Sequence, residues 1–481
     1  MRRNRRVKIV ATLGPASSEP EMLERLFEAG VDVFRINMSH TSHDVARKLH
    51  AAVRNAEVKF KRPIGILCDL QGPKFRIGEI EGGRAFLSER SYFRFDTNEE
   101  PGSAERVFLP HPQIFEAVEP GHTLLLDDGK LKMRVVDRSL REITAEVLVG
   151  GALASRKGIA TPDSILPINP ITEKDRADLD YVLRLGVDWI ALSFVQRGED
   201  LVLARRLIGQ GASLMAKIEK PSAIADLDEI IANADGFMVA RGDLGVEMPI
   251  ERVPGLQKEI TRKARAAGKP VVVATQMLES MISSPVPTRA EVSDVATAVF
   301  DGADAIMLSA ESAVGQFPIE AVRMMDRIAI QVENDPGYNF LVHTMPTVPQ
   351  PTSADAIAAA VRRIADTLQL SAIICYTATG STALRVARER PGLPVIGLTP
   401  VLATGRKLSV VWGIHSVLTS DPENLADMVR KACKIAFEEG FADAGQGVII
   451  TAGVPLGTPG TTNMIRVAYV DETGSPVAVQ A

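Results

Sequence analysis

Three charged residues that follow short apolar segments could together hold a metal ion and stabilise an anion. Lys217 and Glu219 are two positions apart at the end of one segment, so on a β-strand both side chains leave the same face. Asp243 follows the next segment. Carboxylates on neighbouring strands can share one hard divalent ion such as Mg²⁺, and a nearby ammonium group can face a developing oxyanion. From these residues alone, a structural salt bridge between Lys217 and either acid is an alternative.

Two arginines are candidates for binding phosphate. A guanidinium group offers paired donors that match phosphoryl oxygens, so Arg35 and Arg76 are candidate phosphate ligands, although singly each could be a surface arginine. The sequence contains no P-loop, and no dinucleotide-binding glycine motif follows a strand. The pattern therefore excludes the ordinary ATPase fold and the nicotinamide-dependent dehydrogenase fold.

The histidine and serine patterns exclude two further kinds of chemistry. No HExxH or zinc-finger spacing occurs, and His40 and His43 favour a solvated loop over a metal site. No G-x-S-x-G turn supports a Ser-His-Asp or Cys-His site. Zinc-dependent and acyl-transfer reactions are therefore not expected.

Eight short apolar segments, rich in β-branched residues, predict the strands that must position these side chains: 7–13, 33–38, 64–70, 189–194, 214–219, 236–241, 271–277 and 305–309. Most are separated by segments with helical periodicity, namely 21–29, 172–185, 201–209, 223–232, 251–267 and 290–300. Strands that are apolar on both faces and alternate with helices indicate a covered parallel sheet. Eight such units favour a (β/α)8 TIM barrel over two doubly wound sheets, and the residues that close each strand then face one mouth.

Two further regions interrupt or follow this alternation. From about residue 75 to 169, period-two runs and turn pairs such as Asp128-Gly129 predict an inserted β-barrel lid after the third barrel strand. A proline-rich linker begins at Met345 and precedes an open α/β pattern. Five strands are expected in it, over 372–376, 395–398, 415–418, 448–451 and 465–470. We therefore expect a catalytic barrel over 1–74 and 170–345, a lid over 75–169 and a C-terminal α/β regulatory domain over 346–481.

Composition limits the class of partner. The chain has 481 residues, 46% of them hydrophobic, and a net charge of −5, which does not fit a general nucleic-acid or membrane-surface binder. No apolar run approaches the roughly 20 residues that cross a bilayer, and the N-terminus lacks a signal-peptide pattern. Cys68, Cys375 and Cys433 are scattered singly, which fits a reducing compartment. We expect a cytoplasmic protein that binds neither nucleic acid nor membrane.

Seven motifs resemble the pyruvate kinase family, and the similarity covers nearly the whole chain. They are residues 8–17 (KIVATLGPAS), 35–40 (RINMSH), 69–76 (DLQGPKFR), 215–219 (MAKIE), 238–245 (MVARGDLG), 274–281 (ATQMLESM) and 287–294 (PTRAEVSD). The resemblance implies a barrel with a β lid and a C-terminal α/β domain. It also implies the last step of glycolysis, transfer of the phosphoryl group of phosphoenolpyruvate to ADP, which gives pyruvate and ATP.

The resemblance also implies roles for individual residues. Glu219 and Asp243 would hold Mg²⁺ or Mn²⁺, and Lys217 would stabilise the enolate that is then protonated. Arg35, the backbone of Gly242 and Thr275 would position the substrate, with Thr275 near the protonation step. The implied nucleotide contacts are Arg76, Lys157, Asn37 and His40.

One departure from the family concerns its monovalent cation. The family's K⁺ ligands correspond to Asn37, Ser39, Asp69 and the backbone of Leu70. Lys74 stands where many members have a glutamate, which adds two units of positive charge beside that site. We therefore expect that K⁺ is not required, as in the K⁺-independent branch. An exposed surface lysine is the alternative.

A second loop is similar to the family's effector site. Thr377, Thr379, Ser381 and Thr382 follow a predicted strand and open a helix, where hydroxyls and helix N-terminal amides can bind a phosphate. A sugar phosphate or AMP would fit, and a simple helix cap at Ser381 is the alternative. The family also implies a homotetramer.

Two other functions compete with this interpretation. A metal-dependent pyruvate lyase or aldolase also uses a barrel, Mg²⁺ and an enolate, but it needs neither ADP nor a lid carrying Lys157. A regulatory protein without activity would have lost the acid and lysine positions, and all are present. The sequence therefore predicts a phosphotransferase.

Overall fold

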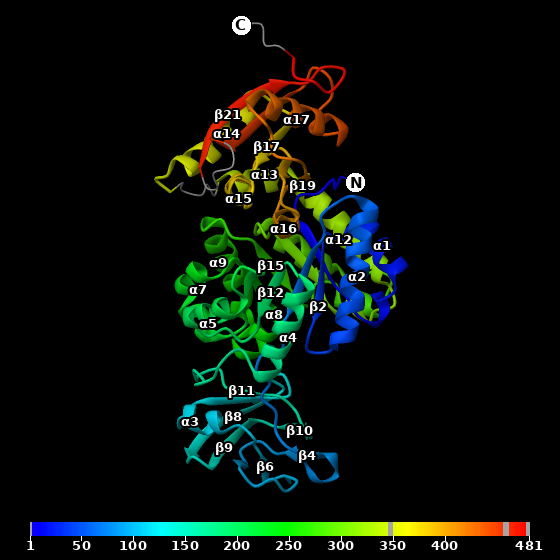
Figure 1. Ribbon diagram of the computed structural model, residues 1–481. Helices are drawn as coiled ribbons and strands as arrows, with labels where there is room; N and C mark the ends of the chain where they lie inside the picture. Colours follow the sequence, from blue (N-terminus) through cyan, green and yellow to red (C-terminus); the bar gives the residue numbers. More distant parts are fainter. Residues whose placement is uncertain (1, 345–349, 456–460, 478–481) are drawn as a thin grey trace.

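The computed structural model describes residues 2–344, 350–455 and 461–477 (Figure 1). The linker predicted from Met345 lies mostly outside the described residues. Three parts follow one another along the long axis in Figure 1, with the barrel between the lid and the C-terminal domain. Within the described residues, no helix combines the length and apolar composition that crossing a membrane requires.

Eight parallel strands close into a barrel in chain order. They are β1 (Lys8–Thr12), β2 (Val33–Asn37), β3 (Gly65–Asp69), β12 (Trp189–Leu192), β13 (Ser213–Ile218), β14 (Gly236–Ala240), β15 (Val271–Ala274) and β16 (Ala305–Leu308). Every predicted barrel strand is confirmed, and several end just before the polar residues that the sequence placed at their ends. Those residues therefore lie at the carboxyl end of the barrel, where side chains can face the mouth.

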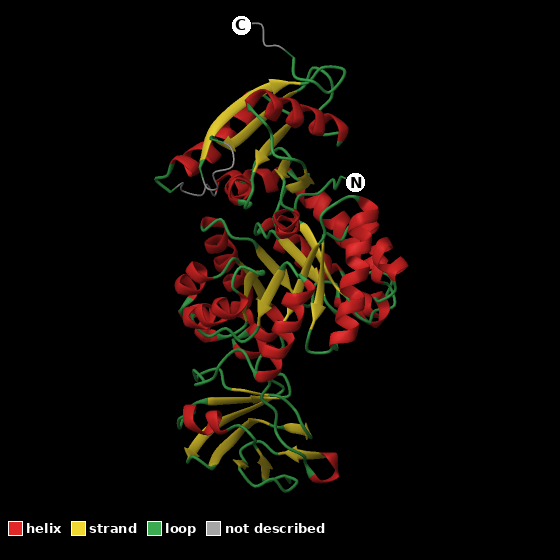
Figure 2. Cartoon of the chain, viewed as in Figure 1, coloured by secondary structure: helices red, strands yellow, loops and turns green. Residues whose placement is uncertain are grey.

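Helices cover the barrel on its outside (Figure 2). They are α1 (Pro20–Ala29), α2 (His43–Phe60), α4 (Glu173–Leu185), α5 (Gly198–Ile208), α6 (Pro221–Ala225), α7 (Leu227–Asn233), α8 (Arg241–Glu247), α9 (Val253–Ala266), α10 (Arg289–Phe300), α11 (Ala310–Ala313), α12 (Pro318–Glu333) and α13 (Pro336–Thr344). The single helix expected over 223–232 is wrong, because the chain breaks at Asp226 into α6 and α7. The Asp226 carboxylate accepts a hydrogen bond from Gly198 N at 2.7 Å and so satisfies the start of α5.

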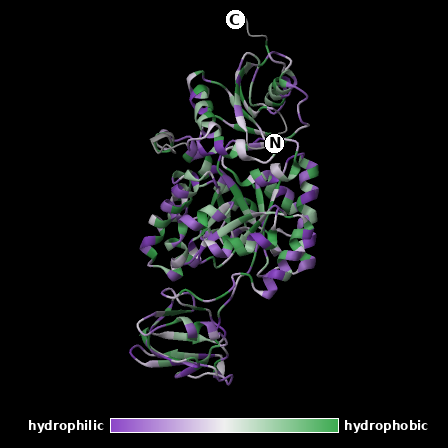
Figure 3. Ribbon diagram, turned by 60° about the vertical axis from the view of Figure 1, so that its left-hand side comes forward, coloured by the Kyte–Doolittle hydropathy of each residue, from purple (hydrophilic) through white to green (hydrophobic). Residues whose placement is uncertain are grey.

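Two apolar layers hold the barrel together. Side chains that point inward, such as Val10, Leu67 and Met238, fill its interior, while their strand neighbours pack against the helices. Figure 3 shows hydrophobic strands at the centre and hydrophilic residues on the outer helix faces. The interior layer continues into C-terminal residues such as Leu408 and Val410, so the C-terminal domain closes the amino end of the barrel.

The lid follows β3 and consists mainly of strands. They are β4 (Arg84–Leu87), β5 (Tyr92–Asp96), β6 (Arg106–Phe108), β7 (Thr123–Leu126), β8 (Leu131–Arg138), β9 (Glu142–Val149), β10 (Gly151–Ala154) and β11 (Ile159–Ala160), with the short helix α3 (Pro112–Ala117). The described strands pair as a six-stranded sheet, β11-β7-β8-β9-β5-β6, and a two-stranded sheet, β10-β4. Phe93, Phe95 and Phe115 lie in the separate core of this domain.

The C-terminal domain is an open sheet in the order β19-β18-β17-β20-β21, with β21 antiparallel. Its elements are α14 (Ser353–Thr367), β17 (Ala372–Tyr376), α15 (Ser381–Arg388), β18 (Val395–Thr399), α16 (Leu402–Lys407), β19 (Ile414–Leu418), α17 (Leu425–Glu438), β20 (Gly447–Gly453) and β21 (Thr462–Tyr469). All five strands expected in this region are present.

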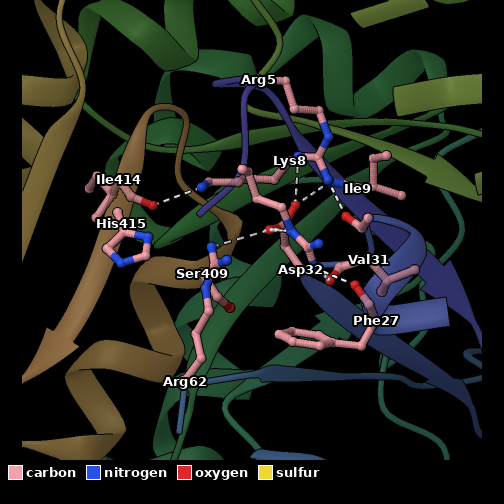
Figure 4. Close-up of polar contacts among 12 residues, drawn as sticks. Arg5, Lys8, Ile9, Phe27, Val31, Asp32, Arg62, Ser409, Ile414 and His415 are labelled. Carbon is pink, nitrogen blue, oxygen red and sulfur yellow. Dashed lines mark hydrogen bonds and ion pairs between the residues drawn. The ribbon is translucent and has the colours of Figure 1, made fainter. Parts of the chain in front are cut away.

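Buried charged residues join this domain to the barrel (Figure 4). Lys8, which begins β1, donates a hydrogen bond from Nζ to the carbonyl of Ile414 at 2.7 Å. The buried Asp32 carboxylate accepts from Arg5 Nη1 at 2.7 Å and lies 3.7 Å from Arg62 Nη2. Burial lowers the pKa of Lys8 to about 7, although Asp32 opposes this. The junction therefore lies at the end of the barrel opposite the lid.

Candidate functional site

A cleft of about 260 Å³ lies between the carboxyl end of the barrel and the lid. The barrel contributes Glu219, Lys220, Asp243 and Glu247, and the lid contributes Asp128 and Thr161. Lys74 and Arg76 line the cleft where the chain passes from β3 into the lid. Residues from both domains therefore face the same cleft.

Lys217 and Glu219 lie side by side, as their two-residue spacing predicts. Lys217 Nζ is 3.4 Å from Glu219 Oε2 and 3.5 Å from Asp69 Oδ1, and it donates to Ser193 Oγ at 2.7 Å. The other oxygen of Glu219 accepts a hydrogen bond from Phe194 N. The salt bridge considered as an alternative is present, but it belongs to a cluster that faces the cleft.

Acids outnumber bases around the lysine. Burial alone would lower the pKa of Lys217, but Asp69, Glu219 and Asp243 raise it above the ordinary lysine value. Burial raises the pKa of Glu219, and Asp243 adds to this effect while Lys217 opposes it. Three carboxylates therefore face two cationic groups, Lys217 and Arg35, so one negative charge is left to attract a further cation.

A divalent metal ion fits these residues. Glu219 is buried, whereas Asp243 is exposed in the first turn of α8 and lines the same cleft. Carboxylate oxygens are ligands that Mg²⁺ prefers, and Mg²⁺ keeps several positions for water or substrate. Within the described residues, no group of three or more His, Cys, Asp or Glu side chains forms a complete metal site. Two protein carboxylates would thus leave most of the coordination sphere open.

Gly242 and Thr275 meet at the neighbouring strand ends. Gly242 N donates to Thr275 Oγ1 at 2.7 Å, and Thr275 has a positive φ of 69°, a strained conformation for threonine. Arg241 supports this turn by donating to the carbonyl of Thr275 at 2.8 Å. Its guanidinium also binds both carboxylate oxygens of Asp294, at 2.5 and 2.7 Å. The strained Thr275 is thus held from two sides.

Arg35 is buried and positioned by an acid. Its Nε donates to Asp69 Oδ2 at 2.9 Å, and its Nη1 donates to Thr12 Oγ1 at 3.0 Å. Burial would raise the pKa of Asp69, but Lys217 and Arg35 lower it. Asp69 on β3 therefore links Arg35 on the neighbouring strand β2 to Lys217 on β13, which is separated from β3 by β12.

The residues that match the family's K⁺ site lie at the carboxyl ends of the neighbouring strands β2 and β3. Asn37 Oδ1 accepts from Ser39 N at 3.1 Å, and the carbonyl of Leu70 accepts from Ser193 Oγ at 2.8 Å. In the part of the chain that the structure describes, Lys74 has no hydrogen bond or ion pair to this set. It lines the cleft beside Glu219 and Asp243. Burial, followed by Arg76, lowers its pKa.

The predicted nucleotide contacts lie in different settings. Arg76 lines the cleft and donates from Nη1 to the carbonyl of Arg156 at 2.9 Å. Lys157 Nζ is 2.7 Å from Asp127 Oδ1 in the lid. His40 is exposed, and its pKa is lowered by burial and then by Lys74 and Arg35. Asn37 ends β2 and His40 lies in the loop that follows, where His40 N donates to the Asn37 carbonyl at 3.2 Å.

The loop before α15 is stabilised by its own hydroxyl groups. Thr377 Oγ1 accepts from Gly380 N at 2.9 Å, and Thr379 Oγ1 donates to Ser381 Oγ at 3.3 Å. Thr382 is buried against Thr462, with 2.7 Å between their hydroxyl oxygens. Gly380 occupies the cap position of α15, with a positive φ of 91°, so the helix cap considered at Ser381 is wrong.

Sequence reasoning missed three residues of the cluster. Ser193 accepts from Lys217, and Lys220 Nζ lies 2.6 Å from Glu247 Oε1. Ser193 lies near the end of the predicted strand over 189–194, which is a weak signal that it faces the mouth. Lys220 and Glu247 gave no signal, because the sequence between them does not indicate their contact.

Comparisons with known proteins agree with this geometry. The model of the pyruvate kinase barrel domain matches residues 4–322, and that of the pyruvate kinase alpha/beta domain matches residues 355–468. A pyruvate kinase from Methylorubrum extorquens is 56% identical over 98% of both chains. One from Agrobacterium vitis is 48% identical over 97% of this chain and 99% of its own.

A solved structure gives the same result. A pyruvate kinase from Cryptosporidium parvum superposes with a TM-score of 0.92 at 33% identity, over 97% of this chain and 96% of that one. Similarity of this extent covers the barrel, the lid and the C-terminal domain together. The chain belongs to the pyruvate kinase family.

Proposed function

We propose that this chain transfers the phosphoryl group of phosphoenolpyruvate to ADP and so forms pyruvate and ATP in the last step of glycolysis. The observation that supports this most strongly is the cluster of Lys217, Glu219 and Asp243 beside one cleft, in a chain that is 56% identical to a pyruvate kinase. Phosphoryl transfer depends on positioning and charge neutralisation more than on covalent catalysis. A buried cationic and acidic cluster supplies both.

Glu219 and Asp243 are the residues that would hold Mg²⁺ or Mn²⁺. When bound, the ion would neutralise oxygens of the phosphoryl group and of the enolate. The excess of acids around Lys217 supports this assignment, because a divalent cation balances it. Members of this family use a divalent metal, and the choice of Mg²⁺ or Mn²⁺ is part of the proposal.

Lys217 stabilises the enolate oxygen that is left when the phosphoryl group departs. Its neighbouring acids keep it protonated, so its positive charge is present before the reaction begins. Arg35, held by Asp69, and the N–H of Gly242 position the substrate. Thr275, whose hydroxyl accepts from Gly242 N, is the residue assigned to the protonation step.

The nucleotide binds on the side of the cleft that carries Arg76. Lys157, Asn37 and His40 complete this proposed set of contacts. Lys157 would exchange its partner Asp127 for a phosphate, which requires movement of the lid. Closing the lid would exclude water that could otherwise accept the phosphoryl group.

Three further assignments belong to the same proposal. The catalytic barrel spans 1–74 and 170–345, the lid 75–169 and the regulatory domain 346–481. K⁺ is not required, since Lys74 brings a positive charge to the cleft. The enzyme works in the cytoplasm as a homotetramer, and its three buried free cysteines agree with a reducing compartment.

The loop of Thr377, Thr379, Ser381 and Thr382 is the proposed site for a phosphorylated effector. The exposed Thr379 hydroxyl, the half-buried Ser381 and the N-terminus of α15 support this. Thermal stabilisation by a sugar phosphate or AMP should be lost in Thr379→Ala and Ser381→Ala variants. If none of these compounds shifts the unfolding temperature, the loop does not bind them.

An assay with phosphoenolpyruvate, ADP and Mg²⁺ tests the central proposal. The native chain should release pyruvate only when all three are present. Lys217→Met should lose about 10²–10³-fold in turnover, since it lacks the group that stabilises the enolate. Metal binding by this variant, followed with Mn²⁺, should persist. Equal turnover in the two proteins would contradict the proposed role.

A further inference from the structure

Lys220 and Glu247 form a dry ion pair next to the proposed metal ligands. Lys220 Nζ is 2.6 Å from Glu247 Oε1, and the two side chains are only 6% and 7% exposed. Both residues line the cleft. The reaction as described assigns neither of them a role.

The pair joins the two elements that carry the acids. Lys220 directly follows Glu219 at the end of β13. Glu247 is four residues after Asp243 on α8, so the two side chains lie on the same face of that helix. Each partner of the pair is therefore tied by a short, rigid stretch of backbone to one acid. Fixing Lys220 against Glu247 limits how far Glu219 and Asp243 can move apart.

Phe194 connects Glu219 and Lys220 through two further contacts. Its N–H donates to Glu219, and its ring centroid is 5.6 Å from Lys220 Nζ, within cation–π range. Phe194 has a positive φ of 57°, which is unfavourable for a bulky residue. The strained residue is thus held by contacts to both Glu219 and Lys220.

The ion pair of Lys220 and Glu247 is not expected to add much to the stability of the fold. Taking two charges out of water is costly, and apolar replacements for a buried pair are often as stable. In addition, Glu247 Oε2 is buried with no hydrogen-bond partner among the described residues. An ion pair that is incompletely satisfied and borders the metal ligands indicates a positioning role.

We propose that Lys220 and Glu247 are positioning residues that set the separation of the Glu219 and Asp243 carboxylates for one divalent ion. The inference rests on the metal site of the proposed function. It concerns the geometry of that site before any substrate binds, so metal affinity of the free protein is the direct measurement.

Binding of Mn²⁺ alone to the metal-free protein, followed by electron paramagnetic resonance, tests this. Lys220→Met should weaken Mn²⁺ binding roughly tenfold, the lower end of the effect of changing residues that orient metal ligands. Removing a nearby positive charge would by itself strengthen cation binding, so the sign separates positioning from simple electrostatics. Lys220→Arg should restore most of the affinity because it keeps the pair.

Three variants complete the design. Glu247→Gln, which keeps its shape, should also weaken binding, and Lys220→Met/Glu247→Met should be no weaker than either single change, because both break one interaction. Lys263→Met removes an ion pair of 2.7 Å to the exposed Asp228 and should leave affinity unchanged. Thermal unfolding of each variant establishes that it is folded.

The possible results distinguish failure of the positioning role from failure of the proposed metal site. Unchanged or tighter Mn²⁺ binding by folded Lys220→Met, or by Glu247→Gln if Lys220→Met does not fold, would overturn the positioning role. If Asp243→Asn also binds Mn²⁺ as tightly as the native protein, the metal site itself is wrong. Weakening by Asp243→Asn with no effect of Lys220→Met would leave the proposed function intact and reject only this inference.

Discussion

Two buried clusters of charge lie at opposite ends of the same barrel, and they differ in sign and in access. At the amino end, Arg5, Lys8 and Arg62 surround Asp32, and the C-terminal domain leaves a cavity of only about 10 Å³ (Figure 4). At the carboxyl end, acids surround Lys217 beside a cleft of about 260 Å³.

The two lysines show what this difference means. Burial lowers the pKa of Lys8 to about 7, whereas the acids around Lys217 raise its pKa despite burial. Lys8 is bonded to a backbone carbonyl of the neighbouring domain, which suits a structural junction. Lys217 keeps its charge beside Glu219, which lines the cleft, and this setting suits catalysis. The two buried lysines therefore differ in pKa because different charges surround them. They also differ in access, since a domain covers one end of the barrel and a cleft borders the other.

The largest expected effect in this comparison comes from replacing the buried acid at each end of the barrel, Asp69 at the carboxyl end and Asp32 at the amino end. Asp69→Asn removes the partner of Arg35 and Lys217 and should lower kcat/KM for phosphoenolpyruvate about 10²-fold, because both groups lose their positions. Asp32→Asn should instead lower the free energy of unfolding by about 3–5 kcal/mol, as expected when a buried ion pair is broken, with kcat unchanged. Steady-state kinetics and urea unfolding measure the two. If kcat/KM fell further in Asp32→Asn than in Asp69→Asn, the two ends of the barrel would not differ in function as described.

Arg241→Lys tests whether the carboxyl end needs a fixed geometry. Lysine cannot bind both oxygens of Asp294 while also donating to the Thr275 carbonyl, so the strained turn should relax. We expect kcat to fall about 10-fold to 100-fold, because a small misplacement of a reacting group is costly. Comparison with Arg406→Lys, which changes an ion pair to Glu57 at the amino end, provides the control. Similar losses in both variants would indicate a general structural effect.

The pH dependence of stability should reveal the amino-end cluster. Lys8 has a pKa of about 7 in the folded protein and about 10.5 when unfolded, so between these values the unfolded state binds more protons. Stability from this group therefore rises with pH across that window, by at most about 1.4 kcal/mol per pH unit. In Lys8→Met this contribution disappears. Urea unfolding of both proteins at pH 7, 8 and 9 measures the difference, and equal slopes would show that Lys8 is not desolvated.

The smallest expected effect is that of potassium. If Lys74 makes a monovalent cation unnecessary in the cleft, turnover with K⁺, with Na⁺ and without alkali cation should agree within experimental scatter. Lys74→Glu should then introduce activation by K⁺, because it restores a negative charge. Many-fold activation of the native chain by K⁺ would contradict the role given to Lys74.

Much of the fold follows from local pattern. Runs of β-branched residues alternating with helical segments predicted all eight barrel strands and the five strands of the C-terminal domain. The prediction of a single helix over 223–232 failed at Asp226, whose backbone leaves the helical conformation and whose carboxylate accepts a hydrogen bond from the distant Gly198 N. Periodicity reports what a segment prefers by itself, and it contains no information about such a partner.

Some features of the candidate site also follow from the sequence alone, and others appear only in the tertiary structure. By itself, the sequence determined that Lys217 and Glu219 share a face, because the two-residue repeat of a strand sets the direction of each side chain. Only the tertiary structure decided that Asp69 joins Arg35 to Lys217, that Ser193 contacts this lysine and that Lys220 meets Glu247. These contacts connect different strands or helices, and their distances depend on how the barrel closes. Strand direction is a local property, whereas closure is a property of the whole chain.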